Sequence, residues 1–248
     1  MILTFTLAII MGLSLGLLGG GGSILTVPIL VYGMNFPPKV SIALSLAIVA
    51  VTSLFGVWGQ YKKKNVILSV FVLFAPTAML GTFAGAKISQ FMSGNTQLIL
   101  FAVIMFIASF FMLKPRQENQ RTEKSKNRKK YFYIAAEGLF VGIVTGLVGV
   151  GGGFLIVPAL VLLSNLTMHQ AIGTSLLIIS VKSFAGFIGY IGLIEVPWEF
   201  LAKFIAFSSI GVVIGSYLSN MIPQDKLKRY FGVFLIFMAV YIIYKNIN

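Results

Sequence analysis

Long uncharged apolar runs alternate with short polar turns along the whole chain. In the first half, four apolar stretches precede a polar linker, and the first of them is interrupted by glycines: 2–32 with its break at 19–22, 40–60, 66–92 and 97–113. The second half repeats the order: 132–163, 170–191, 198–222 and 227–245. About 20 apolar residues at about 1.5 Å per residue cross the hydrocarbon core of a bilayer. The pattern therefore predicts an all-α polytopic membrane protein.

The glycine interruption predicts that the first apolar segment is broken rather than continuous. Residues 2–18 form one helical arm, and the stretch from Ser23 to Tyr32 forms a second, shorter arm. Proline lacks an N–H and fits best in the first turn of a helix. Pro28 therefore predicts a non-helical stretch that continues to about Val27.

The two halves are related by an internal duplication. Residues 16–28 read G-L-L-G-G-G-G-S-I-L-T-V-P, and residues 146–158 read G-L-V-G-V-G-G-G-F-L-I-V-P, at an offset of 130. Nine glycines keep this ungapped register, as do Pro28 with Pro158 and Ser45 with Ser175. The duplication predicts a first transmembrane repeat at 1–113, a basic linker at 114–130 and a second repeat at 131–248.

Composition narrows the classes of function. With 58% hydrophobic and 10% charged residues and a mean hydropathy of +0.96, the chain lies outside the range of soluble domains. It has no cysteine, one histidine and six acidic residues, so few residues could form a metal cluster or a pair of catalytic carboxylates. Neither glycine run is followed by the Lys-Ser/Thr of a phosphate-binding loop. We expect a protein that is not an enzyme, with no metal and no cofactor.

The net charge of +13 is concentrated in one loop. Eight of the 19 basic residues lie in the linker 114–130, between apolar segments. Basic loops of membrane proteins remain in the cytoplasm, so this distribution is a topology signal rather than a nucleic-acid site. We expect a cytoplasmic linker, contact with membrane lipids and no nucleic-acid partner.

Two topologies satisfy the positive-inside rule. If each broken segment crosses the membrane, the repeats are parallel and the loops carry 12 basic residues on one side and four on the other. If each broken segment is re-entrant, the repeats are inverted and the division is 14 to two. The larger asymmetry favours the inverted, re-entrant arrangement, with both termini outside the cytoplasm.

Paired, glycine-broken segments in the two halves of a membrane protein indicate the central site of a transporter. Glycine lets a ligand approach the backbone, and the unpaired N–H groups at a helix start favour anions. The candidate ligand groups are in the two glycine runs: Gly20, Gly21, Gly22 and Ser23, with Gly151, Gly152 and Gly153. The outer glycines Gly12, Gly16, Gly81 and Gly85 are better explained by close helix packing.

Ionisable residues inside apolar spans are costly and so indicate function. Lys182 lies in the middle of the span 170–191, where Thr52 is its counterpart in the first repeat. Glu137 is the one acidic residue inside a predicted span rather than at its first residues, as Glu199 is, and it is a candidate for proton coupling or an interfacial residue.

Hydroxyl groups beside the broken segments are further candidates for anion binding. Ser45 and Ser175 occupy the same place in both repeats, and Thr52 and Thr174 lie near them. Several such hydroxyls are expected simply to bond the carbonyl of their own helix.

At these residues the chain resembles the TauE/SafE family of sulfite and organosulfur-anion exporters. The resemblance rests on the two glycine motifs, on S-I-A-L-S-L at 41–46 and A-I-G-T-S-L at 171–176, and on the duplicated four-segment layout. It implies a secondary permease for small sulfur oxyanions such as sulfite, a sulfonate or thiosulfate, in the plasma membrane of a bacterium or archaeon. The sequence leaves open a different solute, import, a non-transporting membrane scaffold, and a homo-oligomer.

The absence of cysteine makes the topology directly testable. A single cysteine at Ser125 should react from the cytoplasmic side, and one at Asn246 from the outside, because the re-entrant arrangement places the linker and the C-terminal end on opposite sides. Labelling of intact and inverted vesicles with an impermeant thiol reagent measures this. Reaction of both positions from the same side would favour the eight-crossing topology.

Overall fold

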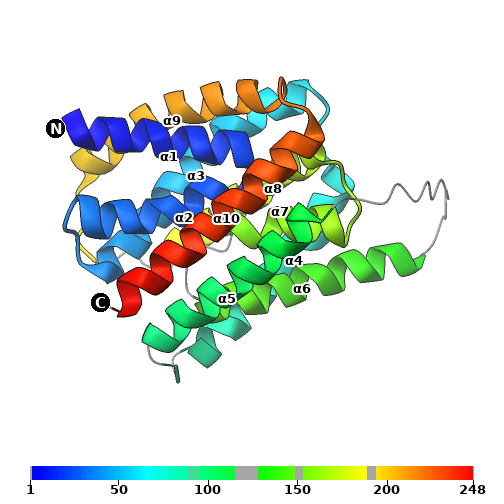
Figure 1. Ribbon diagram of the computed structural model, residues 1–248, viewed down its shortest axis with the longest axis horizontal. Helices are drawn as coiled ribbons and strands as arrows, with labels where there is room; N and C mark the ends of the chain where they lie inside the picture. The colour runs from blue at the N-terminus through cyan, green and yellow to red at the C-terminus, as the bar shows by residue number, and fades with distance from the viewer. Residues whose placement is uncertain are drawn as a thin grey trace.

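The computed structural model describes residues 2–89, 91–92, 94–114, 128–148, 153–188 and 194–247. The secondary-structure elements formed by these residues are all helices (Figure 1). The first repeat contains α1 (Ile2–Leu18), α2 (Gly21–Pro28), the π-helical segment η1 (Ile29–Gly33), α3 (Pro38–Lys62), α4 (Leu68–Ser89) and α5 (Gly94–Leu113). The second contains α6 (Arg128–Val148), α7 (Gly153–Leu162), α8 (Met168–Ile188), α9 (Trp198–Ser219) and α10 (Gln224–Ile247).

Five of these helices are long and apolar enough to cross a membrane: α3, α4, α8, α9 and α10. The remaining apolar helices in the described part of the chain are shorter. Large apolar side chains also cover the outside of the molecule; Leu80, Phe106 and Phe237, for example, are more than half exposed. Such a surface is suited to lipid, and the prediction of an all-helical membrane protein is confirmed.

The outer glycines lie where helices of the two halves pack directly backbone to backbone. A Cβ on Gly12 or Gly16 of α1 would collide with the carbonyl oxygen of Ser208 or Val212 in α9. Because residue numbers rise together along this contact, α1 and α9 are parallel, and Figure 1 shows them side by side at one edge of the molecule. The predicted packing role of these glycines is confirmed.

The same contact recurs between α4 and α6 with every residue shifted by 130. Gly142 packs on the carbonyl group of Ala78, as Gly12 does on Ser208. Gly81 and Gly85 pack on the carbonyl groups of Leu139 and Ile143. The two closest helix pairs therefore each join one helix from the first half to one from the second.

The central pair, α3 and α8, is antiparallel. Gly56 packs on Leu176, and the residues 130 positions away from these, Gly186 and Leu46, pack on each other. Between these contacts the Ser180 hydroxyl donates a hydrogen bond of 2.8 Å to the carbonyl of Ala50, its own counterpart. Equivalent residues thus meet head to tail across the centre of the molecule.

Basic turns gather at one end of the helices, which we call the basic end and define by residues 60–67, 113–114, 164–169 and 219–229. Asn65 contacts Asn220 across this end, and the Lys228 amine donates to the backbone carbonyl of Lys114. At the opposite end, α1 begins and α10 ends, and Lys245 lies 5.2 Å from the ring centroid of Tyr32. Each end therefore collects turns from both halves.

Replacing a glycine at these crossings should destabilise the protein. We expect Gly85→Ala to reduce stability by about 1–3 kcal/mol, because its Cβ would meet the backbone of Ile143, which cannot move alone. Gly33→Ala is the matched control, since the nearest atom there is the flexible end of Leu7 at 3.3 Å. Thermal unfolding in detergent measures both; equal melting temperatures for the two variants would contradict close packing at Gly85.

Candidate functional site

The first broken segment folds into a helical hairpin, residues 2–33, which we call the first hairpin. At its base the Thr4 hydroxyl contacts the Met34 sulfur at 3.3 Å, and Gly33 lies against Leu7. Nearer the tip, Gly22 packs on Leu15. The returning arm, α2 with η1, therefore lies antiparallel along α1 and ends near the level at which α1 begins.

Two glycines form the tip of this hairpin. Gly19 has φ +72°, a left-handed conformation that glycine adopts without strain, and its N–H donates to the Leu15 carbonyl to end α1. Gly20 is the N-cap residue of α2. The predicted unwinding as far as Val27 is wrong: α2 begins at Gly21, and Pro28 lies at its end. Packing of Gly22 on α1 holds this short arm helical.

The second hairpin is formed by α6 and α7. The sequence candidates Gly151 and Gly152 lie outside the described residues, whereas Gly153 begins α7. At the base of this hairpin the Ser164 hydroxyl donates to Glu137 at 2.5 Å. Asn35 and Asn165, 130 residues apart, have φ of 57° and 56° in the turns that follow the two hairpins.

The two hairpins touch at their tips. A Cβ on Gly20 would collide with the carbonyl group of Gly153, and a Cβ on Gly153 would lie 2.8 Å from the Ser23 hydroxyl oxygen. Ser23 and Gly153 are themselves equivalent residues of the two repeats. The tip of the first hairpin and the start of α7 therefore meet at one buried point of the fold.

Hydroxyl groups bond the carbonyls of the first tip. The Ser23 hydroxyl donates to the Gly20 carbonyl at 2.7 Å. The Ser175 hydroxyl, from α8, is 3.3 Å from the Gly19 carbonyl oxygen and 2.9 Å from that of Ile172. Both serines are buried, so the structure brings these two predicted residues to the tip.

The remaining predicted hydroxyl residues lie elsewhere or bond locally. The Ser45 and Thr52 hydroxyls donate to Ile42 and Ile48 of their own helix, each at 2.7 Å. The Thr174 hydroxyl accepts the N–H of Ile67 at 3.0 Å and so supports the start of α4 at the basic end. Thr174 and its neighbour Ser175 thus point to different parts of the molecule.

Lys182 is a buried cation beside the second hairpin. Its side chain donates a 2.7 Å hydrogen bond to the hydroxyl of Thr145, near the end of α6. Lys182 is 8% exposed, and no carboxylate among the described residues lies within salt-bridge distance of it. It follows Ile179, which packs on Gly153, by about one helical turn. A buried ammonium group with a neutral partner favours binding of an anion.

Glu137 lies apart from this region. Its partner Ser164 belongs to the turn after α7, at the base of the second hairpin rather than at its tip. Position at the base suits the interfacial role that the sequence left open.

Sequence reasoning missed a polar network at the basic end. The buried Gln60 amide donates to the Ser219 hydroxyl at 2.8 Å, and Asn65 donates to both Gln60 and Asn220 at 2.7 and 2.8 Å. Nε2 of His169 is 3.0 Å from the Ser219 carbonyl oxygen; since a carbonyl only accepts, this nitrogen carries the hydrogen. The sequence signal that could have indicated this network is the group of amide residues Gln60, Asn65 and Asn220, which lie beside basic turns in an otherwise apolar sequence.

Comparison with known proteins places the chain in a family. The family model described as "Sulfite exporter TauE/SafE" matches residues 4–242. A "probable membrane transporter protein" of Xylella fastidiosa (strain Temecula1) is 32% identical, over 96% of this chain and 92% of the relative. The probable membrane transporter protein YdhB of Bacillus subtilis is 28% identical, over 88% and 90%. No solved structure matches significantly. The chain belongs to the TauE/SafE sulfite exporter family, whose members here are described as membrane transporters.

Proposed function

We propose that the protein is a secondary transporter that exports small sulfur oxyanions: sulfite, or a related sulfonate or thiosulfate. The observation that carries this proposal is the buried Lys182, which has a hydroxyl partner and no carboxylate among the described residues. Family membership supplies the substrate class. The groups of the site favour a small anion, but they do not distinguish a sulfur oxyanion from other small anions.

The tips of the hairpins supply the polar groups for an anion. The first-turn N–H groups of α2, at Gly21 to Ser23, have no carbonyl partner within that helix, and the positive end of the helix dipole lies there. The Ser23 and Ser175 hydroxyls donate to tip carbonyls in this conformation and can rotate toward an oxyanion. Lys182 balances the charge from the side of the second hairpin.

The helix directions support an inverted topology with re-entrant hairpins. The equivalent helices α3 and α8 are antiparallel, and both are long and apolar enough to cross a membrane, as expected when the axis that relates the halves lies in the membrane plane. Each hairpin returns to the end at which it starts, as the contacts of Thr4 with Met34 and of Glu137 with Ser164 support. The positive-inside rule makes the basic end cytoplasmic.

Alternating access then requires the basic end to open and close. The Gln60–Ser219 and Asn65–Asn220 hydrogen bonds join helices of both halves there. In this conformation they hold α3 to α9 and close the route from the cytoplasm to the hairpin tips. Rocking of one half against the other would break these bonds and admit the anion.

Loss of the buried cation should abolish most transport. We expect Lys182→Gln to reduce sulfite flux into proteoliposomes at least tenfold, because an anion desolvated at the hairpin tips loses its counter-charge. Lys203→Gln is the matched control, since Lys203 is 54% exposed and paired with Glu199. Flux with and without a pH gradient, with sulfate, thiosulfate and a sulfonate as competitors, reports coupling and selectivity.

The outcomes of this flux assay separate the alternatives. Selective competition, with loss in the Lys182 variant only, supports the sulfur-oxyanion exporter. Flux that another small solute abolishes, or that runs only inward, indicates a different permease. Absence of flux and of anion binding by folded protein would indicate a membrane scaffold and overturn the proposal.

Breaking the network should expose the site to the cytoplasm. We expect Gln60→Leu to accelerate, several-fold, the modification of a single cysteine at Ser175 by an impermeant reagent added at the basic end. Thr4→Val, which alters the opposite end, is the control and should leave this rate unchanged. An unchanged rate in Gln60→Leu, with the protein folded, would remove the network from the gate.

A further inference from the structure

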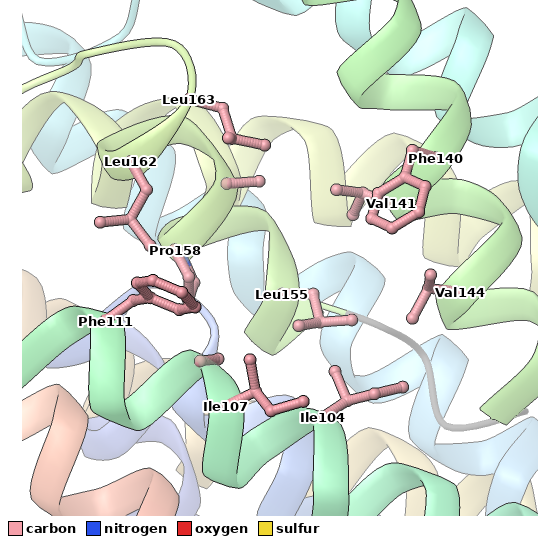
Figure 2. A pocket seen from close by; sticks show the side chains of 12 residues that line it. Ile104, Ile107, Phe111, Phe140, Val141, Val144, Leu155, Pro158, Leu162 and Leu163 are labelled. Carbon is pink, nitrogen blue, oxygen red and sulfur yellow. The ribbon is translucent and has the colours of Figure 1, made fainter.

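An entirely apolar groove opens on the membrane-facing side between α5, α6 and α7 (Figure 2). Its volume is about 350 Å³. Figure 2 shows Ile104 and Ile107 of α5, Phe140 and Val144 of α6, and Leu155 of α7 arranged around one shared space. The groove is separate from the hydrogen-bonded hairpin tip and from Lys182, neither of which lines it.

The groove depends on small residues that the other half lacks. Ala108 and Ala159 line it, and the residues 130 positions away are the larger Met238 and Ile29. At these two positions the other half has larger side chains, so duplication of the fold alone does not require the same hollow there. The groove is therefore a local feature of this half.

The shape of the groove suits part of a hydrocarbon chain. From Ile104 to Phe111 it follows α5 for about 10 Å, at about 1.5 Å per residue. Every residue that lines it is apolar, and the groove is open at its side. A lipid tail can therefore lie along α5 in the groove and continue beyond it.

Positive charge lies beyond one end of the groove. Lys114 follows Ile107 by one heptad, and its N–H donates to the Phe110 carbonyl, so the helical turn continues to it. The Lys228 amine lies beside it and donates to its carbonyl oxygen at 3.1 Å; the Lys114 side chain is exposed and that of Lys228 is half-buried. Asp225 lies three residues before Lys228 on α10, and Glu137 on α6 accepts a hydrogen bond from Ser164.

We propose that this groove binds one acyl chain of an anionic phospholipid whose headgroup phosphate lies at Lys114 and Lys228. Lipid tails surround a membrane transporter and match the apolar lining, and the two lysines provide the charge complementarity that selects an anionic headgroup. The site is independent of the transported substrate.

Tryptophan quenching by brominated lipid tests this proposal on the full chain. Trp58 and Trp198, both more than 60% exposed, are changed to phenylalanine, and one tryptophan is introduced by Phe111→Trp. The control reporter is Phe237→Trp, at a lipid-exposed position of α10 outside the groove. Each protein is reconstituted with brominated phosphatidylglycerol or brominated phosphatidylcholine at equal mole fraction.

We expect the groove reporter to favour phosphatidylglycerol over phosphatidylcholine by at least fivefold and the control reporter to show no preference. Each lysine is expected to contribute about fivefold, so Lys114→Gln or Lys228→Gln alone should lower the preference about fivefold and the double variant should remove it. Ala108→Met, which introduces the residue of the other half, should reduce quenching at the groove by both lipids.

Two results would overturn the proposal. Equal lipid preference at the groove and control reporters would mean ordinary lipid contact. Protection of the groove reporter from both lipids, with cross-linking of two chains, would mean that a second copy covers the groove. Because Lys114 is exposed, its variant tests the site even if Ala108→Met does not fold.

Discussion

A break in a helix at membrane depth leaves backbone N–H and carbonyl groups that hydrocarbon cannot satisfy, and this constraint governs the fold. The chain has such a break at Gly19–Gly20, and both residues are buried in protein. The Ser23 and Ser175 hydroxyls donate hydrogen bonds to the carbonyls of the tip, and Gly153 of the other half packs on Gly20. The tip of the first hairpin therefore depends on residues of the opposite half of the protein.

This need explains why helices pack mainly across the two halves. α1 lies against α9 and α4 against α6, each pair in backbone contact that only glycine permits. Such packing fixes the directions of α1 and α6 relative to the opposite half. The repeats are consecutive in sequence but interlocked in space.

Charged residues lie mainly at the ends of the helices. Basic residues lie in turns at one end, where a side-chain network of Gln60, Asn65 and Asn220 also joins the halves. Among the residues that the structure describes, the buried lysine is Lys182, whose amine donates to the Thr145 hydroxyl. The proposed binding of an anion depends on this lysine, because charges interact more strongly in an apolar interior than in water.

Much of this protein was determined by its sequence alone. The length and spacing of the apolar runs predicted the helices, because about 20 apolar residues without charge have one stable arrangement in a bilayer. The 130-residue offset paired Gly12 with Gly142 and Gly81 with Gly211, and close packing is the consequence of having no Cβ at those positions. The two glycine motifs, together with the segments at 41–46 and 171–176 and the duplicated layout, also indicated the family.

Tertiary structure decided which polar groups meet. Thr174 and Ser175 are adjacent, yet one supports the start of α4 and the other bonds the tip of the first hairpin. Likewise, sequence predicted an unwound chain to Val27, whereas packing of Gly22 on Leu15 makes the arm helical from Gly21. Periodicity fixes a residue's place along its own helix, but its partner belongs to a helix distant in sequence. Only the packing of the two halves determines that partner.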